Sequence, residues 1–402
     1  MASVQDLPIE IIQQILLEAD PLDVASFSRT CHAYHSIIYD PPNSTSFWRE
    51  LYLRQPLDDP RKCYNELGNP VYNDTDPSNI VVDWKGRLQR FTRAKTVVNV
   101  PGLCRIENGE RREIYRTLVD AIREMPPMRD DDDDSHSLTA AYVASLLVGS
   151  RFLDNDRWLD ALDLEERQLR ARLHTYFGIT QQDLFLPHLS EARGAVYALR
   201  SWKPENFYGP FFKDRSGRVD WEMMLHIHLV MSMHVCIALG LTDWKERIQN
   251  GRYFVYPMSL VFCQAWIPRG LVVDEVEDWA GVTGIWDCAF CFIDHRELLE
   301  YNYINANATL SENIPLDTTL FEDPDFIEIY RKITIKFHLV RSEPDPEHPT
   351  RPKLFIEGGL GGTPQMNGWI AMTPDDQVRW HFESGDPGNA VWSSEGHTSW
   401  RR

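Results

Sequence analysis

Cys288 and Cys291 form a C-x-x-C pair, a spacing that many structural metal sites use. A structural zinc ion needs four ligands, and the sequence offers no second pair of cysteines or histidines at a suitable spacing. If this segment is a strand, the two side chains point to opposite faces, because side chains alternate along a strand. We therefore predict two unrelated thiols.

The apolar segment from Trp221 to Leu241 contains a second group of potential ligands, namely His226, His228, His234 and Cys236. Residues two apart lie on different sides of a helix, so His226 and His228 cannot easily share one ion. We predict that these histidines belong to a core or an interface, and that the chain has neither a metal site nor a cofactor.

The same segment is just long enough to span a bilayer, and it carries one formal charge, at Glu222. A membrane helix would more often have Lys or Arg on its cytoplasmic flank, whereas Asp220 and Asp243 stand at the ends here. We predict a helix that is buried on all sides within a helical domain, and no contact with a membrane.

The sequence contains no recognisable catalytic motif. The glycine-rich run EGGLGGTPQMNG, which begins at Glu357, follows neither the P-loop spacing nor G-x-G-x-x-G, and it has no Lys-Ser/Thr ending. No G-x-S-x-G elbow and no H-E-x-x-H motif occurs. We predict that the run is a loop between strands, that there are no catalytic residues, and that the protein is not an enzyme.

The formal net charge of −19 and the pI of about 5.1 argue against nucleic acid and anionic membranes as partners, because both attract clustered Lys and Arg. The aspartates 130–134 repel one another and predict an exposed loop. The seven cysteines form no compact ladder, and the N-terminus lacks the regions of a secretory signal. These features indicate an intracellular protein with reduced thiols, in the cytoplasm, the nucleus or both.

The elements that position these residues divide the 402-residue chain into four segments, since a single core does not grow to this size. Residues 1–55 show short helices, one of which begins at Pro21 with Asp20 as its cap. Residues 56–136 are typical of a linker with helices and the acidic loop, and residues 137–252 are typical of a helical domain.

From Trp286 onward, short runs rich in β-branched and aromatic residues alternate with Gly, Pro, Asn and Asp. This pattern predicts an antiparallel β domain, barrel-like or sandwich-like, within residues 253–402. The predicted fold class is α+β, with three or four N-terminal helices, a central helical region and this C-terminal domain.

The N-terminal helices are too apolar for a unit that stands alone. Leu7–Ile38 carry apolar residues on more than one helical face, and a unit of about 45 residues buries too little surface to be comfortably stable. We therefore expect another protein to cover part of this surface.

Residues 7–52 resemble the F-box motif. The matching residues are Leu7, Pro8, Glu10, Ile11, Ile12, Ile15, Leu16, Pro21, Leu22, Asp23, Val24, Phe27, Ser28, Cys31, Tyr34, Phe47, Trp48 and Leu51. Ala19 and Tyr34 stand where a larger aliphatic residue and a Trp are common in the motif. The resemblance implies a substrate receptor of a Skp–cullin–F-box ubiquitin ligase, which holds an unknown protein substrate and has no catalytic residues of its own.

Carried over by position, the resemblance implies a set of residues that face the Skp-type adaptor, which in turn binds a cullin: Leu7, Pro8, Ile11, Ile15, Leu16, Leu22 and Val24. Trp48 and Leu51 would instead pack inside the motif. The β-rich segment 253–402 would then bind the substrate.

The rest of the chain resembles a group of fungal F-box proteins in the stretches DWAGVTGIWDCAFCFIDHRELLEYN and GWIAMTPDDQVRWHFESGDPGNAVWSSEG. Similar proteins continue with glycine-rich strands after SSEG, whereas this sequence stops at HTSWRR, which suggests a truncated barrel with an exposed edge. Gly284-x-Trp286 is similar to the G-x-W of lipocalin-like barrels. An alternative function is therefore small-ligand binding in a pocket lined by aromatic residues such as Trp286, Trp369 and Trp380.

Overall fold

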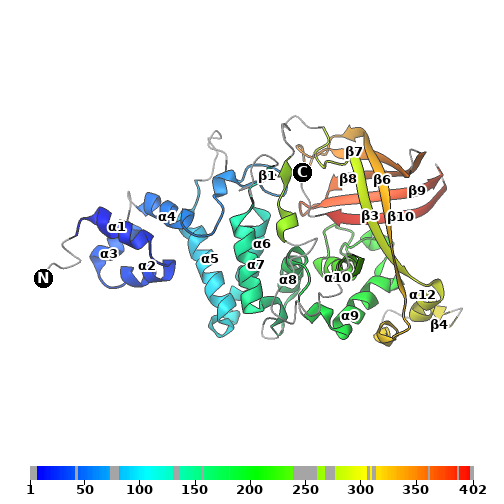
Figure 1. The fold of residues 1–402 in the computed structure, drawn as a ribbon, viewed down its shortest axis with the longest axis horizontal. Coiled ribbons are helices and arrows are strands. Elements are labelled where there is room, and N and C mark those ends of the chain that lie inside the picture. The colour runs from blue at the N-terminus through cyan, green and yellow to red at the C-terminus, as the bar shows by residue number, and fades with distance from the viewer. Residues whose placement is uncertain are drawn as a thin grey trace. The chain divides into compact units, whose positions relative to one another are not determined.

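The computed structural model describes residues 7–40, 44–72, 81–129, 136–155, 158, 160–180, 182–238, 260–267, 277–305, 308–309, 314–360, 363–386 and 389–398. The chain forms two compact units. The helical unit comprises Met1–Asn65, Asn69–Pro126 and Ser135–Asp160, and the sheet unit comprises Glu66–Gly68, Pro127–Asp134 and Ala161–Arg402. The predicted α+β class is confirmed, because helices form the N-terminal part and one antiparallel sheet forms the C-terminal part (Figure 1). The four segment boundaries remain a prediction.

Four short helices begin the helical unit: α1 (Ile9–Leu17), α2 (Pro21–Ser28), α3 (His32–Tyr39) and α4 (Ser44–Leu53). The Asp20 side chain accepts a hydrogen bond from the backbone N–H of Leu22 at 2.9 Å, and Pro21 is the first residue of α2. This is the predicted cap, and it satisfies a backbone donor that the helix itself leaves free. The predicted start of α2 is therefore confirmed.

Three longer helices complete the helical unit: α5 (Trp84–Asn99), α6 (Glu110–Arg123) and α7 (Leu138–Ser150). The apolar residues that recur along α6 are all buried, namely Ile114, Tyr115, Leu118, Val119 and Ile122. The Asp58 carboxylate, from the loop after α4, accepts hydrogen bonds from the Ser137 hydroxyl at 2.5 Å and the Leu138 backbone N–H at 2.9 Å. A negative charge at the start of α7 is favourable there, because the N-terminal end of a helix is positive. The predicted acidic loop, 130–134, lies outside the described residues.

The sheet unit includes the helices α8 (Leu164–Phe177), α9 (Leu186–Tyr197) and α10 (Trp221–Ala238), and α10 packs against both of the others. The predicted helix from Trp221 is confirmed as far as Ala238, and residues 239–241 lie outside the described part. Of residues 221–234, eight are buried and six are half-buried, so the prediction of a helix buried on all sides holds only in part. Among the described helices, none is both long enough and apolar enough to cross a membrane.

The interior of these helices contains His228, whose side chain is 2% exposed. Burial, reinforced by nearby His174, lowers the pKa of His228 to about 4, against 6.5 for an ordinary histidine. Above pH 6.5 His228 is neutral in both the folded and the unfolded chain, so its protonation does not change the free energy of unfolding there. Between pH 6.5 and 4 the unfolded chain binds a proton that the folded chain does not, and the free energy of unfolding falls by about 3 kcal/mol.

We expect His228→Gln to lose most of this pH dependence. Urea unfolding at pH 7 and pH 4.5 measures it, and the fall in unfolding free energy should be about 2–3 kcal/mol smaller in the variant than in the wild type. His188→Gln, at an exposed histidine of the same unit, serves as the control. A variant that loses as much stability on acidification as the wild type would contradict the assignment.

A buried polar network around Glu66 joins distant parts of the sheet unit. The Glu66 carboxylate accepts hydrogen bonds from Arg172 at 2.5 Å, Tyr176 at 3.1 Å and Gln377 at 2.7 Å. The guanidinium of Arg172 also lies over the ring of Trp221, 4.6 Å from its centroid. The side chains of Arg172 and Glu66 are each 10% exposed, so loss of either would leave a nearly buried charge without its partner.

Six antiparallel strands form the main sheet in the order β10-β9-β8-β7-β6-β3. Their bounds are β3 (Gly284–Ile293), β6 (Glu328–Glu343), β7 (Lys353–Leu360), β8 (Thr363–Met372), β9 (Val378–Asp386) and β10 (Asn389–Thr398). Strands β6 to β10 follow one another as neighbours, whereas β3 and β6 are separated in the chain by α12 (His295–Asn302), β4 (Tyr303–Asn305) and β5 (Ala308–Thr309). A short parallel pair, β1 (Met128–Arg129) and β2 (Trp266–Ile267), also belongs to this unit.

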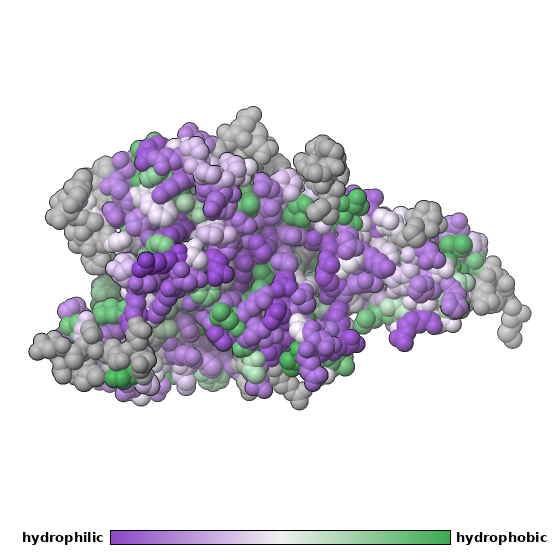
Figure 2. Space-filling view, turned by 180° about the vertical axis from the view of Figure 1, so that it is seen from behind, coloured by the Kyte–Doolittle hydropathy of each residue, from purple (hydrophilic) through white to green (hydrophobic). Residues whose placement is uncertain are grey.

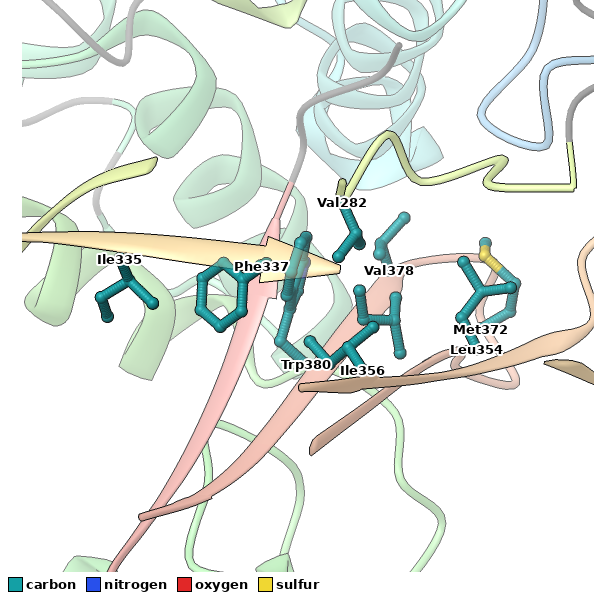
Figure 3. Packing of buried hydrophobic residues seen from close by; sticks show 9 residues of the cluster. Val282, Ile335, Phe337, Leu354, Ile356, Met372, Val378 and Trp380 are labelled. Carbon is teal, nitrogen blue, oxygen red and sulfur yellow. The ribbon is translucent and has the colours of Figure 1, made fainter. Parts of the chain in front are cut away.

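The sheet curls into a half-barrel whose inner face is a hydrophobic cluster (Figure 3). The buried members are Val282, Ile335, Phe337, Leu354, Ile356, Ile370, Met372, Val378 and Trp380. Trp286 on β3 reaches across the curl to Trp380 on β9, with ring centroids 5.4 Å apart. Phe337 and Phe382 stack at 5.4 Å beside them. Side chains from β3, β6 and β9 thus meet on the inner face.

The predicted loop in the glycine-rich run from Glu357 is wrong, because β7 continues to Leu360 and β8 begins at Thr363. Packing explains two of the glycines. A Cβ on Gly358 would lie 2.5 Å from the ring of Phe337, and one on Gly368 would lie 2.3 Å from the carbonyl oxygen of His381. These positions lie inside strands, and neighbouring atoms leave no room for a side chain.

Candidate functional site

The first two helices leave a row of aliphatic side chains exposed. We call this set, Leu7, Ile9, Ile11, Ile15 and Leu22, the α1–α2 apolar surface; its members are between 39% and 56% exposed. Ile11 and Ile15 are four residues apart and share one side of α1, whereas Ile12 and Leu16 share another side and are buried. In Figure 2, green hydrophobic groups interrupt the purple hydrophilic surface at the end that these helices form.

The predicted adaptor-facing residues divide into two groups. Leu7, Pro8, Ile11, Ile15 and Leu22 are exposed, as an unpaired surface requires. Leu16 is 5% exposed and Val24 is 0% exposed, so the structure corrects their placement from the surface to the interior. Both are apolar motif residues, and the motif alone does not say which face of each helix the neighbouring helices cover.

Ile9, at the start of α1, is a further exposed aliphatic residue at 48%, although the motif does not single it out. Exposed aliphatic residues in one small helical unit are typical of a site that another protein covers.

The interior of the four helices accounts for the other motif residues. The predicted burial of Trp48 and Leu51 is confirmed, since they are 4% and 0% exposed. The indole N–H of Trp48 donates to the Ile38 carbonyl at 3.0 Å, which leaves this buried polar group satisfied. Tyr34, which replaces the usual Trp, stacks on Phe27 with centroids 4.2 Å apart. The substitution therefore keeps an aromatic contact inside the unit.

A cavity of about 360 Å³ lies elsewhere in the helical unit, between α4, α5, α6 and the start of α7. Its charged lining residues have partners within the protein: Arg87 binds Glu124 at 2.7 Å, and Asp58 holds the start of α7. Burial, and to a lesser extent the Asp58 charge, raises the pKa of the Cys63 thiol, so this lining cysteine stays protonated at neutral pH. These contacts give the cavity a structural role.

The predicted pocket lined by three tryptophans is wrong for Trp369. Ile370 beside it points into the inner cluster, so Trp369 faces the opposite side of the sheet, because side chains alternate. There its ring stacks on His381 at 5.1 Å, and the ammonium of Lys353 lies 4.1 Å from its centroid. Trp286 and Trp380 do meet, but their rings pack on each other within the filled inner face. This packing counts against a lipocalin-like cavity in the described part of the sheet.

Among the described residues, one group of His, Cys and acidic side chains has the geometry to hold a metal ion. Its members are His234 on α10, Cys291 on β3 and Glu328 on β6, whose ligand atoms all lie within 4.8 Å of one another. Cys288 packs against the inner cluster, so the two thiols of the C-x-x-C pair point to opposite faces as predicted. No local spacing joins these three positions, and sequence reasoning therefore missed the group.

Comparison with curated proteins and with solved structures finds no match for this chain. The F-box-like family model matches residues 4–54, the range that contains α1 to α4 and the α1–α2 apolar surface. The resemblance in the motif residues and the observed helices agree with this match. The chain therefore carries an F-box-like domain at residues 4–54.

Proposed function

We propose that this chain is the non-catalytic substrate-recognition subunit of a cullin-RING ubiquitin ligase of the Skp–cullin–F-box type. The observation that carries the proposal is the α1–α2 apolar surface, which lies within the F-box-like domain. A Skp-type adaptor covers these side chains and links the chain to a cullin. Removing apolar surface from water favours such an association by roughly 25 cal/mol per Å².

The sheet unit holds the protein substrate in this proposal. It has its own hydrophobic core and its own buried polar network, so it keeps its shape independently of the adaptor-binding helices. The division of labour matches the two compact units: one binds the ligase scaffold and the other presents the protein to be modified. Ubiquitin transfer itself takes place on other subunits, in the cytoplasm, the nucleus or both.

Affinity purification with mass spectrometry under proteasome inhibition tests the proposal. We expect the wild-type chain to recover a Skp-type adaptor and a cullin, and Ile15→Glu to lose both, because the variant places a charge in the apolar surface. The substrate should remain bound to Ile15→Glu and should accumulate in cells that express it.

Ile106→Glu is the matched control, since Ile106 is 52% exposed and Ile15 is 56% exposed, and Ile106 lies outside residues 4–54. It should recover the adaptor as the wild type does. Equal recovery of the adaptor by Ile15→Glu and the wild type would contradict the proposal, as would a wild-type chain that recovers no adaptor.

A further inference from the structure

Three elements of the sheet unit bring sulfur and nitrogen atoms together beside Glu328. The Sγ atom of Cys291, on β3, lies 3.4 Å from the Sδ atom of Met231 on α10. His234 follows Met231 by three residues, so the two side chains share one face of that helix. The Nε2 atom of His234 lies 2.7 Å from a carboxylate oxygen of Glu328.

The 2.7 Å contact between Nε2 of His234 and Glu328 is an ion pair only when the imidazole is protonated. Nε2 of His234 is buried and has no hydrogen-bond partner among the described residues, although the Glu328 oxygen is close to it. A buried ring nitrogen without a partner is costly, and a cation beside it would accept its lone pair. The geometry therefore indicates a site that is completed by a positive ion.

Glu328 is already committed to other groups. One of its oxygens accepts two hydrogen bonds from Arg193, at 2.8 and 3.0 Å, and the other accepts one from the Tyr197 hydroxyl at 2.5 Å. The carboxylate and the guanidinium neutralise each other, and the Glu328 side chain is only 2% exposed. The ligands that remain for an ion are a thiol, a thioether and an imidazole, the set that soft metal ions prefer.

We propose that Met231, His234 and Cys291 bind one Cu(I) ion. The charge of the site selects a monovalent ion. When a thiolate at Cys291 binds Cu(I), the added charges sum to zero and the Glu328–Arg193 pair stays balanced. A divalent ion such as Zn²⁺ would leave one unit of positive charge uncompensated in a buried site, which is unfavourable. This inference goes beyond the proposed ligase function and does not depend on it.

Competition with the Cu(I) chelator bicinchoninate, under anaerobic and reducing conditions, tests the proposal on the full chain. The wild type should remove one equivalent more of Cu(I) from the chelator than the Cys291→Ser variant does. Cys288→Ser is the matched control, because Cys288 lies on the same strand and faces the inner cluster, and it should bind as the wild type does. Met231→Leu, which conserves volume, should weaken binding by about tenfold or more, since even an outer-shell change costs about 10–100-fold.

X-ray absorption of the loaded wild type supplies a second readout, in which sulfur and nitrogen neighbours are expected around copper. A shell of sulfur alone would overturn the proposal, because it would indicate binding to other thiols. Equal Cu(I) uptake by the wild type and Cys291→Ser would overturn it too, and so would Cys291-dependent binding of Zn²⁺ without Cu(I). Far-ultraviolet circular dichroism of each variant verifies the fold, and Met231→Leu keeps the test decisive if Cys291→Ser does not fold.

Discussion

The double variant Ile11→Glu/Ile15→Glu is expected to weaken binding of a Skp-type adaptor by at least about 100-fold, as measured by titration calorimetry with the purified full chain. Both side chains are about half exposed in the free chain. Burial of this remaining apolar surface in an interface would stabilise the complex by about 1 kcal/mol per residue, and the variant loses that contribution. Burial of each glutamate without a partner adds a cost of about 1 kcal/mol or more. The sum is about 4 kcal/mol, and 1.4 kcal/mol corresponds to a tenfold change, so a loss of about 100-fold is the lower bound.

The fold of the variant should be intact, because exposed substitutions away from special features change stability by about 0.5 kcal/mol or less. Leu103→Glu/Ile106→Glu is the matched control, since it also charges two aliphatic residues of the helical unit that are about half exposed. The control should bind the adaptor normally. If both double variants lost binding equally, a general effect of charge on the helical unit would be responsible and the assigned surface would be wrong.

Phe337→Ala is expected to destabilise the sheet unit by about 3–5 kcal/mol, the usual cost of truncating a fully buried phenylalanine. Phe337 is 3% exposed, and its ring contacts both Phe382 and Trp286. The loss combines the transfer of the ring from water with the cavity that it leaves between strands. Urea unfolding followed by tryptophan fluorescence measures the change, because Trp286 and Trp380 lie within the affected cluster.

Phe290→Ala on strand β3 is the comparison, since Phe290 is 43% exposed. It should cost less than about 1 kcal/mol, because much of the ring is already in water. The helical unit should unfold at an unchanged urea concentration in both variants, as expected for a separate cooperative unit. Equal losses in the two variants would show that the inner cluster does not carry the stability of the sheet.

Local signals explain what the sequence predicted correctly. The cap at Asp20 and the apolar spacing along α6 involve residues within one or two turns of each other, so neighbouring positions in the chain reveal them. The family motif likewise works because α1 to α4 form one small unit from consecutive residues. Burial of Trp48 follows from that motif and from the small interior that it shares with Ile38.

The failures involve contacts between distant residues. Leu16 and Val24 are as apolar as Ile15 and Leu22, and only the packing of neighbouring helices decides which pair is covered. Gly368 is constrained by a carbonyl on the adjacent strand. The orientation of Trp369 depends on the strand register, because one step along a strand changes the face.

The copper ligands show the same limit. Met231 and His234 lie on α10, whereas Cys291 is sixty positions after Met231, on strand β3. Composition and spacing therefore describe each ligand only as a core residue or a lone thiol. The site exists because α10 packs next to β3 and β6, a consequence of the whole sheet unit.

The Glu66 network has a consequence for the order of events during synthesis. Gln377, which donates to Glu66, is 311 positions later in the chain, so the ribosome adds it roughly 15–60 s afterwards at about 5–20 residues per second. Every residue of the helical unit precedes position 161 and has emerged well before then. Under the proposed function, a nascent chain therefore presents its adaptor-binding unit while the sheet unit still lacks its last strands, and newly made copies gain access to the ligase scaffold before they are able to choose a substrate.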